Sequence, residues 1–231
     1  MNVELLAHTP DPEKVVCFSA NLCYSKSTLA QTVEKFYDPK ARQRLLRMLV
    51  EKGHFSPFEH VSFTFGISGV SRVTTHQLVR HRIASYSQQS QRYVELGEKN
   101  FGFVEPASIK KSALHQAFLE HMEAARRLYQ QLMEAGIHQE DARYVLPSAV
   151  SSNIIATFNA RSLFNFFELR CCYHAQEEIR RLAFRMLALV RKTAPNIFKD
   201  SGPTCFRGFC REKDEKCLLY RARISRQTVR C

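Results

Sequence analysis

The chain contains no apolar run that approaches the ~20 residues needed to span a bilayer. Its first residues, Met-Asn-Val-Glu-Leu-Leu-Ala-His, lack the basic segment and the long apolar segment of a secretory signal. No G-x-G-x-x-G motif occurs, which excludes the glycine-rich dinucleotide-binding loop of Rossmann folds. No internal repeat, low-complexity tract or linker interrupts the chain before about residue 200. These absences predict one cytoplasmic globular protein with no membrane partner.

Paired C-x2-C spacing, which is typical of zinc ribbons, is also missing. Without a secretion signal we expect reduced thiols rather than a disulfide framework. Structural or incidental thiols are the favoured interpretation, and a metal or disulfide tie among the clustered C-terminal cysteines is the alternative. The eight cysteines are Cys17, Cys23, Cys171, Cys172, Cys205, Cys210, Cys217 and Cys231.

The charge is strongly one-sided, since 34 basic and 22 acidic residues give a formal net charge of +12. A basic surplus is compatible with a nucleic-acid partner. It is equally compatible with small anionic ligands such as nucleotides and folates. Residues 207–230 are basic without order in their spacing, whereas the internal arginines lie inside patterned segments. The distribution of charge therefore favours small anions over nucleic acid.

The apolar spacing predicts helices that alternate with a few strands. Asp-Pro pairs at 11–12 and 38–39 are helix start signals, with the aspartate as candidate N-cap. Alternation of apolar and polar side chains over 58–67 predicts a strand with one buried face. We expect strands over 58–67 and 151–158, an extended piece over 101–104, and helices that start near residues 12 and 39 and that span 70–80, 108–135, 140–146, 159–172 and 175–193.

These elements predict an α+β fold with a small, mostly antiparallel sheet covered by helices, two of which are long. A single domain is expected over residues 1–200. Residues 201–231 are expected to form a basic, cysteine-bearing C-terminal tail that packs loosely.

One polar stretch, residues 80–93, stands out from these elements. Of its fourteen residues only Ile83 and Ala84 are aliphatic, and three are arginines. Guanidinium groups match phosphate and carboxylate geometry and stack on flat rings, so the stretch predicts a partly buried site for anionic, planar ligands. Gln77 and Arg80 lie three residues apart on the preceding helix and share a face. The alternative is a solvated helix end followed by a polar turn.

Two further polar clusters accompany this stretch. His54 and His60 lie six residues apart before the first expected strand, and this spacing supports a metal site only weakly. Asn159 begins a helix whose N-terminus, with Arg161, is suited to bind an anion. Asn159 could also simply cap that helix. Arg143 is a further candidate donor.

Four blocks of the chain form one ordered set over about residues 50–195. The blocks are His54-x-Ser56-Pro57-Phe58-Glu59-His60, Arg80-His81-Arg82-x-x-Ser85-x-x-x-x-Ser90-x-Arg92, Ala142-Arg143-x-Val145-Leu146-Pro147, and Asn159-Ala160-Arg161-Ser162 continued by Asn165, Arg170 and His174-Ala175-Gln176. Together they resemble the flavin-dependent thymidylate synthases. One block alone could arise by chance, whereas four in the same order are not expected to.

The resemblance implies a homotetramer whose active sites are shared between subunits, with no nucleic-acid partner. It implies an enzyme, a methyltransferase that converts dUMP to dTMP with methylenetetrahydrofolate as one-carbon donor and NADPH-reduced FAD as hydride source. His54 is implied on the folate and nicotinamide side. The implied FAD contacts are Ser56, Arg80, His81, Arg82, Gln88, Asn159, Arg161 and Asn165. The implied dUMP contacts are Gln77, Arg80, Gln88, Gln89, Ser90, Gln91, Arg92, Arg143 and Arg170.

Methylation at C5 of uracil requires electron density at C5. The resemblance implies that Arg170 is the catalytic residue, since it would stabilise the N3 anion of uracil by charge-assisted hydrogen bonding, without a protein nucleophile. Addition of a cysteine to C6 is the alternative. Cys171 and Cys172 are adjacent to each other, so a cysteine nucleophile is considered, but neither lies in the Pro-Cys context of the flavin-free thymidylate synthases.

One position departs from a form of the motif, because residue 88 is Gln where some members carry Glu, which removes a charge near the pyrimidine and flavin. Ser90 is interpreted as a hydrogen-bonding contact rather than a nucleophile. Two other hypotheses stay open: a nucleic-acid-binding or RNA-modifying protein, which the net charge favours, and a non-catalytic nucleotide-binding module.

Overall fold

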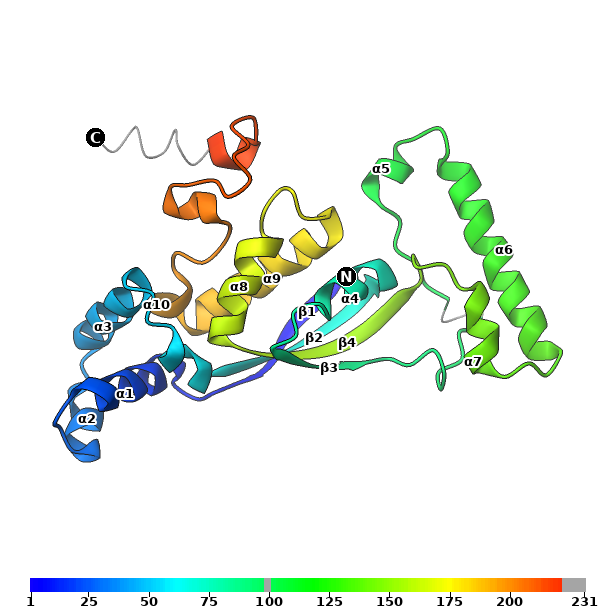
Figure 1. Ribbon diagram of the computed structural model, residues 1–231. Coiled ribbons are helices and arrows are strands. Elements are labelled where there is room, and N and C mark those ends of the chain that lie inside the picture. The colour runs from blue at the N-terminus through cyan, green and yellow to red at the C-terminus, as the bar shows by residue number, and fades with distance from the viewer. Residues whose placement is uncertain (98–100, 222–231) are drawn as a thin grey trace. The chain divides into compact units, whose positions relative to one another are not determined.

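The computed structural model describes residues 1–97 and 101–221, so Cys231 and the last part of the expected tail lie outside the described residues. Four strands form one sheet in the order β1-β2-β4-β3 (Figure 1). The central pair β2 and β4 is antiparallel, because the Ala160 amide bonds the Val61 carbonyl beyond one end and the Arg72 amide bonds the Val150 carbonyl beyond the other. The strands are β1 (Asn2–His8), β2 (Ser62–Ser71), β3 (Ala84–Gln88) and β4 (Ser151–Asn159).

Side chains alternate between a buried and an exposed face along the two central strands. In β2 the side chains of Phe63, Phe65 and Ile67 are buried, as their spacing predicts. In β4 Ile154 is buried and Ile155 is 46% exposed. The α+β class with a small antiparallel sheet is therefore confirmed, and helices cover the buried face.

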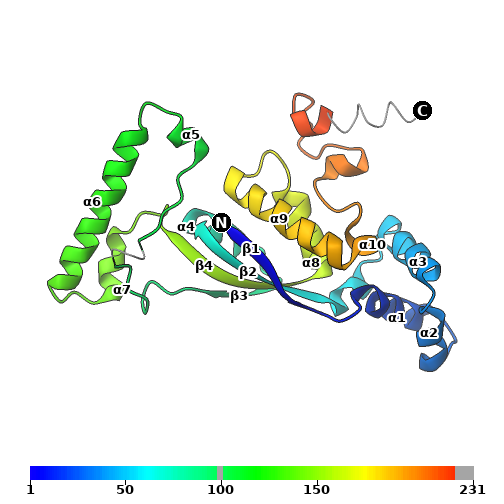
Figure 2. The same cartoon turned by 180° about the vertical axis from the view of Figure 1, so that it is seen from behind.

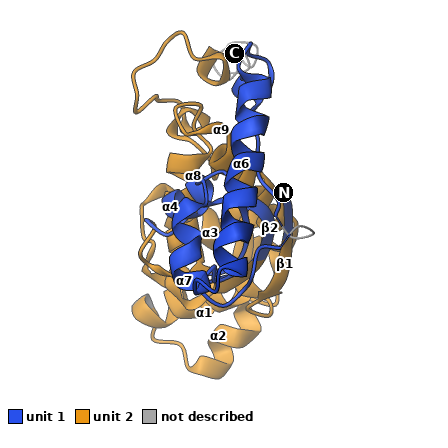
Figure 3. Cartoon of the chain, turned by 90° about the vertical axis from the view of Figure 1, so that its right-hand side faces the viewer, with its two compact units in different colours: residues 1–3, 66–80, 86–156 blue, residues 4–65, 81–85, 157–231 orange. Residues whose placement is uncertain are grey.

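The chain divides into two compact units, coloured separately in Figure 3. Each unit gathers segments that lie far apart in the sequence. Unit 1 consists of residues 1–3, 66–80 and 86–156, and unit 2 of residues 4–65, 81–85 and 157–231. Contacts are described below within each unit.

Unit 1 contains the longest helix of the described chain, α6, which packs on the short helix α7 (Figure 1). Its core centres on Met122 and Tyr129 of α6 with Leu96 and Val150. The Tyr129 hydroxyl is satisfied in this core by the Leu96 amide, at 3.4 Å. The helices of this unit are α4 (Arg72–Leu78), α5 (Ala107–Lys110), α6 (His115–Glu134), α7 (Gln139–Ala142) and the 3-10 helix η2 (Arg143–Val145).

Unit 2 has a core rich in phenylalanine. Phe198 contacts Phe63 and Phe167 edge to face, and Phe158 packs on Phe166 with ring centroids 5.5 Å apart. Helices α8 and α9 pack against each other, and Figure 2 shows them side by side. The helices are α1 (Pro12–Tyr24), α2 (Leu29–Lys35), α3 (Pro39–Glu51), η1 (Ser56–His60), α8 (Ala160–Arg170), α9 (Glu177–Thr193), α10 (Pro195–Phe198) and η3 (Thr204–Arg207).

The two expected long helices are confirmed as α6 and α9, with 20 and 17 residues. Asp38 caps α3 as expected, since its carboxylate accepts from the amides of Lys40 and Ala41. Asp11 stands at the N-cap of α1 but makes no side-chain cap bond, because its carboxylate binds Lys14 at 2.9 Å.

Several boundaries differ from the sequence expectation. The strand predicted over 58–67 begins at residue 62, because residues 56–60 form η1 around a buried Pro57. The helix predicted over 108–135 is broken into α5 and α6 by a turn that Ser112 stabilises through its hydroxyl. β1, α2 and β3 were not expected.

The first residues of the expected tail are packed rather than loose. Ser201, Thr204 and Cys205 are 5–6% exposed. Arg191 of α9 donates to the Ser201 carbonyl at 2.7 Å. Loose packing is therefore wrong for residues 201–205, which are buried and whose first carbonyl is bound by an arginine of α9, a contact that composition could not reveal.

No helix in the described ranges is both long enough and apolar enough to cross a membrane.

Candidate active site

Gln88 lies at the end of β3 in unit 1 and is held by two buried hydroxyl groups. Its amide nitrogen donates to Thr75 Oγ1 at 2.9 Å and to Ser152 Oγ at 3.2 Å. Thr75 and Ser152 are 0% and 5% exposed. The hydroxyl groups of α4 and β4 therefore hold the half-buried side chain of Gln88 in one position. Neither Thr75 nor Ser152 was expected from the sequence to belong to the site.

Gln89 is fixed at the same strand end. Its backbone amide bonds the Asn153 carbonyl at 2.9 Å, and its side-chain oxygen accepts from Asn153 Nδ2 at 3.0 Å. Arg72 donates to the Gln89 carbonyl at 3.0 Å. The polar stretch is thus a paired strand end rather than a solvated turn.

Two of the expected dUMP contacts meet at Glu140. Arg92 Nε pairs with the Glu140 carboxylate at 2.6 Å, and Arg143 Nε donates to the Glu140 carbonyl at 3.0 Å. Burial, and then the positive charge of Arg143, lower the pKa of Arg72. Arg92 and Glu140 line an open groove of about 560 Å³. Three guanidinium groups against one carboxylate leave this part of unit 1 suited to a phosphate.

The other expected contacts of unit 1 are less constrained. The side chain of Gln77 donates to the Val73 carbonyl of its own helix, at 3.3 Å. The Ser90 hydroxyl accepts from the Arg92 amide at 3.1 Å, so it shapes the turn that carries Arg92. Arg80 is exposed and Gln91 half-buried.

In unit 2 the expected catalytic residue Arg170 contacts His81. Arg170 Nε donates to His81 Nε2 at 3.0 Å, and the His81 ring packs edge-on against Phe166 with centroids 4.9 Å apart. Burial, and then the charge of Arg170, lower the pKa of His81 from 6.5 to about 4. His81 is therefore neutral at physiological pH, and Nε2 can accept only if the ring proton is on Nδ1.

Arg170 keeps hydrogen-bonding capacity after this contact. Within residues 1–97 and 101–221 its two terminal nitrogens have no hydrogen-bond partner, and neither is a buried orphan. The side chain is half-buried, and desolvation lowers its pKa. A guanidinium oriented at Nε with free terminal groups can bind two adjacent acceptors of a planar ligand.

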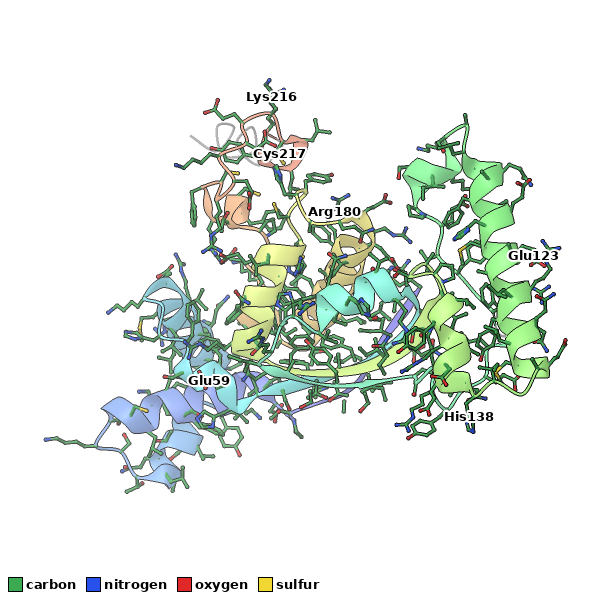
Figure 4. The ribbon with its side chains drawn as sticks, turned by 45° about the vertical axis from the view of Figure 1, so that its right-hand side comes forward. Glu59, Glu123, His138, Arg180, Lys216 and Cys217 are labelled. Carbon is green, nitrogen blue, oxygen red and sulfur yellow. The ribbon has the colours of Figure 1, made fainter. Side chains whose placement is uncertain are left out.

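A second cluster of unit 2 forms around the N-terminus of α8. Asn159 caps this helix, since its side-chain oxygen accepts from the Ser162 amide at 2.8 Å. Arg161 pairs with Glu59 of η1, the residue labelled in Figure 4. Sequence spacing did not predict this pairing of two blocks 102 positions apart.

Arg161 and Asn165 open onto a cavity of about 780 Å³, within the size range of ligand pockets. Phe55 and Phe164 give it flat apolar walls with ring centroids 5.5 Å apart. Its basic lining residues are Arg44, Arg47, Arg161, Lys199 and Arg207. Three carboxylates, those of Glu51, Glu168 and Asp200, also line it, so five basic side chains face three acidic ones. Aromatic walls with this surplus of cations are compatible with a large planar anion such as FAD. His54, Ser56 and Arg82 are exposed elsewhere in the same unit.

The histidines and cysteines do not form a metal centre in the described part of the chain. No group of three or more His, Cys, Asp or Glu side chains there is arranged to hold an ion. Four thiols, those of Cys172, Cys205, Cys210 and Cys217, line one small cavity of about 40 Å³ near the tail (Cys217 is labelled in Figure 4). All seven cysteines of the described ranges are unpaired.

Cys171 is buried, and burial raises the pKa of its thiol to about 12. Burial also raises the pKa of Cys172. A thiol nucleophile needs a lowered pKa, so the environment of both residues opposes attack on a pyrimidine ring.

Comparison with known proteins decides the family. A family model described as "Thymidylate synthase complementing protein" matches residues 4–196. A flavin-dependent thymidylate synthase of Geobacter sulfurreducens is 48% identical over 218 residues, which are 94% of this chain and 94% of that protein. The chain belongs to the flavin-dependent thymidylate synthases.

A second relative and a solved structure are also similar to this chain. A flavin-dependent thymidylate synthase of Clostridium tetani is 47% identical over 94% of this chain and 93% of its own length. A crystal structure of a UMP/dUMP methylase of Streptomyces cacaoi, bound with 5-Br dUMP, matches with a TM-score of 0.74 at 28% identity, over 86% of this chain and 93% of that chain. The resemblance found in four sequence blocks is confirmed, and so is the expectation of an FAD-dependent enzyme of this family.

The structure groups the expected contacts by unit. The expected dUMP contacts lie in unit 1 except for Arg170, and the expected FAD contacts lie in unit 2 except for Arg80 and Gln88. Sequence reasoning missed Thr75, Ser152 and Glu140. Their signal was weak, because a single hydroxyl group or carboxylate inside a helix or strand is indistinguishable in sequence from ordinary surface polarity.

Proposed function

We propose that the chain converts dUMP to dTMP, with methylenetetrahydrofolate as the one-carbon donor and NADPH as the reductant of FAD. The names of the relatives and the 5-Br dUMP held by the structural neighbour support this proposal. The observation that carries it is Arg170, a half-buried guanidinium that neutral His81 orients while its terminal nitrogens stay available.

Arg170 acts on the pyrimidine edge in this proposal. Its terminal N–H groups donate to uracil where negative charge develops around N3, which favours the N3 anion and raises electron density at C5. The carbon at C5 then forms a bond to the methylene carbon and loses its proton, while the two bonds from that carbon to the folate nitrogens break and leave tetrahydrofolate. No protein nucleophile takes part.

Neutral His81 has a positioning role beside Arg170. An imidazolium would repel the guanidinium, whereas the neutral ring accepts its Nε–H and leaves the full positive charge for the ligand. Burial of His81 against Phe166 keeps the ring in that state.

FAD supplies the hydride that completes the methyl group when it is bound. Arg161 and Asn165 would hold it together with the aromatic and basic cavity lining. The remaining proposed FAD contacts are Ser56, Arg80, His81, Arg82, Gln88 and Asn159. His54 is proposed on the folate and nicotinamide side.

The nucleotide phosphate would bind where Arg92 and Arg143 meet at Glu140, and Arg92 would exchange the Glu140 carboxylate for the phosphate. Gln77, Arg80, Gln88, Gln89, Ser90, Gln91 and Arg170 complete the proposed dUMP contacts. We further propose a homotetramer with shared active sites, a cytoplasmic location and no nucleic-acid partner. An isolated monomer that turns over at the rate of the assembly would contradict the shared site.

Anaerobic spectroscopy with product analysis tests this function. The purified protein should be yellow or take up added FAD, NADPH should bleach its visible band, and dTMP should appear only when dUMP and methylenetetrahydrofolate are both present. A colourless protein that fails to take up FAD would contradict the proposal and favour a nucleic-acid-binding or nucleotide-binding protein.

Substitutions then distinguish activation of uracil by Arg170 from attack by a cysteine thiol. Arg170→Ala should abolish dTMP formation, while the double variant Cys171→Ala, Cys172→Ala should retain it. Arg127→Ala, which removes an exposed arginine of α6, is the matched control and should leave turnover unchanged. A folded double cysteine variant without turnover would refute the route through Arg170.

A further inference from the structure

Two buried hydroxyl groups determine how the side chain of Gln88 is oriented. The Thr75 hydroxyl donates to the Arg72 carbonyl at 3.1 Å, an oxygen that can only accept. Its single proton is therefore used, and toward Gln88 the Thr75 oxygen can only accept. Of the two ends of a glutamine amide only the nitrogen donates, so Nε2 must face Thr75, as it does at 2.9 Å.

Ser152 reinforces this orientation from the opposite strand. Its hydroxyl oxygen lies 3.2 Å from the same Nε2, so both protons of the amide nitrogen have a partner. The two hydroxyl-bearing residues are buried, and exchanging the amide ends would place Gln88 Oε1 against the occupied Thr75 oxygen. Such a contact between two acceptors is unfavourable.

The other end of the amide is left available. In the described ranges Gln88 Oε1 has no hydrogen-bond partner, and it is not among the buried unpartnered atoms, so it keeps some exposure to solvent. The charged dUMP contacts proposed above, Arg80, Arg92 and Arg143, only donate. Gln88 therefore presents a fixed acceptor among donors, and an acceptor selects a ligand that carries an N–H or O–H group there.

The structure of dUMP limits which of its groups can donate a hydrogen bond to Gln88 Oε1. In dUMP the donors are N3–H and the 3′-hydroxyl of the sugar. An acceptor at N3–H would hold the proton that the proposed reaction removes, and it would oppose the N3 anion that Arg170 favours. We propose that Thr75 and Ser152 are positioning residues that turn Gln88 Oε1 outward as the acceptor for the 3′-hydroxyl of dUMP. This inference rests on the proposed function.

The same geometry predicts how a glutamate at position 88 would behave. A carboxylate also presents an acceptor outward; toward its inner oxygen Ser152 could donate its hydroxyl proton, whereas Thr75 could donate only by releasing the Arg72 carbonyl. Gln88→Glu should therefore keep the preference for a 3′-hydroxyl, whereas Gln88→Met should lose it.

The test compares dUMP with 2′,3′-dideoxyuridine 5′-monophosphate, which lacks only the 3′-hydroxyl. For the wild-type enzyme the KM of the dideoxy analogue should be about ten-fold higher, the cost of one lost hydrogen bond to a positioned acceptor. Thr75→Val keeps the shape but removes the hydroxyl. It should raise the KM of dUMP, leave that of the analogue unchanged and so bring the ratio toward one. Thr75→Ser should restore the ratio.

Controls separate this role from a general loss of structure. The hydroxyl groups of Thr64 in β2 and Thr157 in β4 are hydrogen-bonded to each other at 2.9 Å. Thr64→Val breaks this bond and should leave the KM ratio of the two nucleotides unchanged. In a Gln88→Met background Thr75→Val should have no further effect on the ratio, because the two residues act as one unit.

The outcomes also separate this inference from the proposed function. A wild-type protein that makes no dTMP contradicts the function. Turnover with equal KM values for the two nucleotides, or an equal rise of both KM values in Thr75→Val, overturns the positioning role and leaves the function standing.

Discussion

Acidification tests the electrostatics of the Arg170–His81 pair. Burial and the Arg170 charge hold the pKa of His81 at about 4, against 6.5 for an ordinary histidine. Between about pH 6.5 and about pH 4 the unfolded chain therefore binds a proton that the folded chain does not. The free energy of unfolding must fall as the pH is lowered through this window, and it is unaffected by His81 above it.

The size of the effect follows from proton linkage. From about pH 7 to about pH 5, a histidine with these two pKa values lowers the free energy of unfolding by about 2 kcal/mol. Solvent screening of a ring that is not fully enclosed reduces this to about 1 kcal/mol. Urea unfolding at one protein concentration should show this difference between the wild type and His81→Gln, which cannot titrate.

A direct titration checks the cause. In protein with ¹³C-labelled histidine, the signal absent from His81→Gln should stay in its neutral position down to about pH 5. In Arg170→Leu the pKa of His81 should rise but stay below 6.5, because burial is the larger cause. A wild-type His81 that titrates near 6.5, or equal pH dependence of stability in wild type and His81→Gln, would refute the reasoning.

Three further perturbations have expected outcomes. Glu140→Gln should lower the KM of dUMP about two- to five-fold, since it frees Arg92 from a half-exposed ion pair. Gly69→Ala should lower the Tm by several degrees, because Gly69 has φ +65° and a Cβ there would lie 3.2 Å from the backbone nitrogen of Met1. Iodoacetamide near pH 8 should label exposed Cys23 but not Cys171, as peptide mass spectrometry can show.

Each perturbation has a matched control. Glu134→Gln changes an exposed glutamate of α6 that hydrogen-bonds Gln130, and it should leave the KM of dUMP unchanged. Gly97→Ala places a Cβ in open space and should leave the Tm unchanged. Weaker dUMP binding in Glu140→Gln, an unshifted Tm in Gly69→Ala, or rapid labelling of Cys171 would each contradict the corresponding expectation.

The elements that sequence predicted correctly are those with a strong local signal. β2 follows strict alternation, and α9 has a continuous apolar stripe with Gln176 as its cap. The opposite holds for β3, whose Ser, Tyr and Gln side chains carry no buried apolar face. It forms a strand because it pairs with β4, and a pairing between distant segments leaves no periodic pattern in the sequence. α2 was overlooked although Thr28 and Gln31 form a capping box.

The candidate site divides in a similar way. The sequence predicts which residues can bind anions, because the guanidinium group of an arginine such as Arg170 has a distinctive chemistry. It does not predict which partner orients each guanidinium group. His81 lies 89 positions from Arg170, and Ser152 lies 64 positions from Gln88, so only the folded sheet brings them together.

Burial of residues 201–205 has a consequence for protein engineering. Composition suggests shortening the chain at residue 200, and the family match ends at residue 196. Either cut would remove the carbonyl oxygen of Ser201 that Arg191 binds at 2.7 Å and would open α9 to water. A shortened expression variant should therefore keep η3 through Arg207, which also pairs with Glu168 of α8, and begin its deletion only beyond that helix.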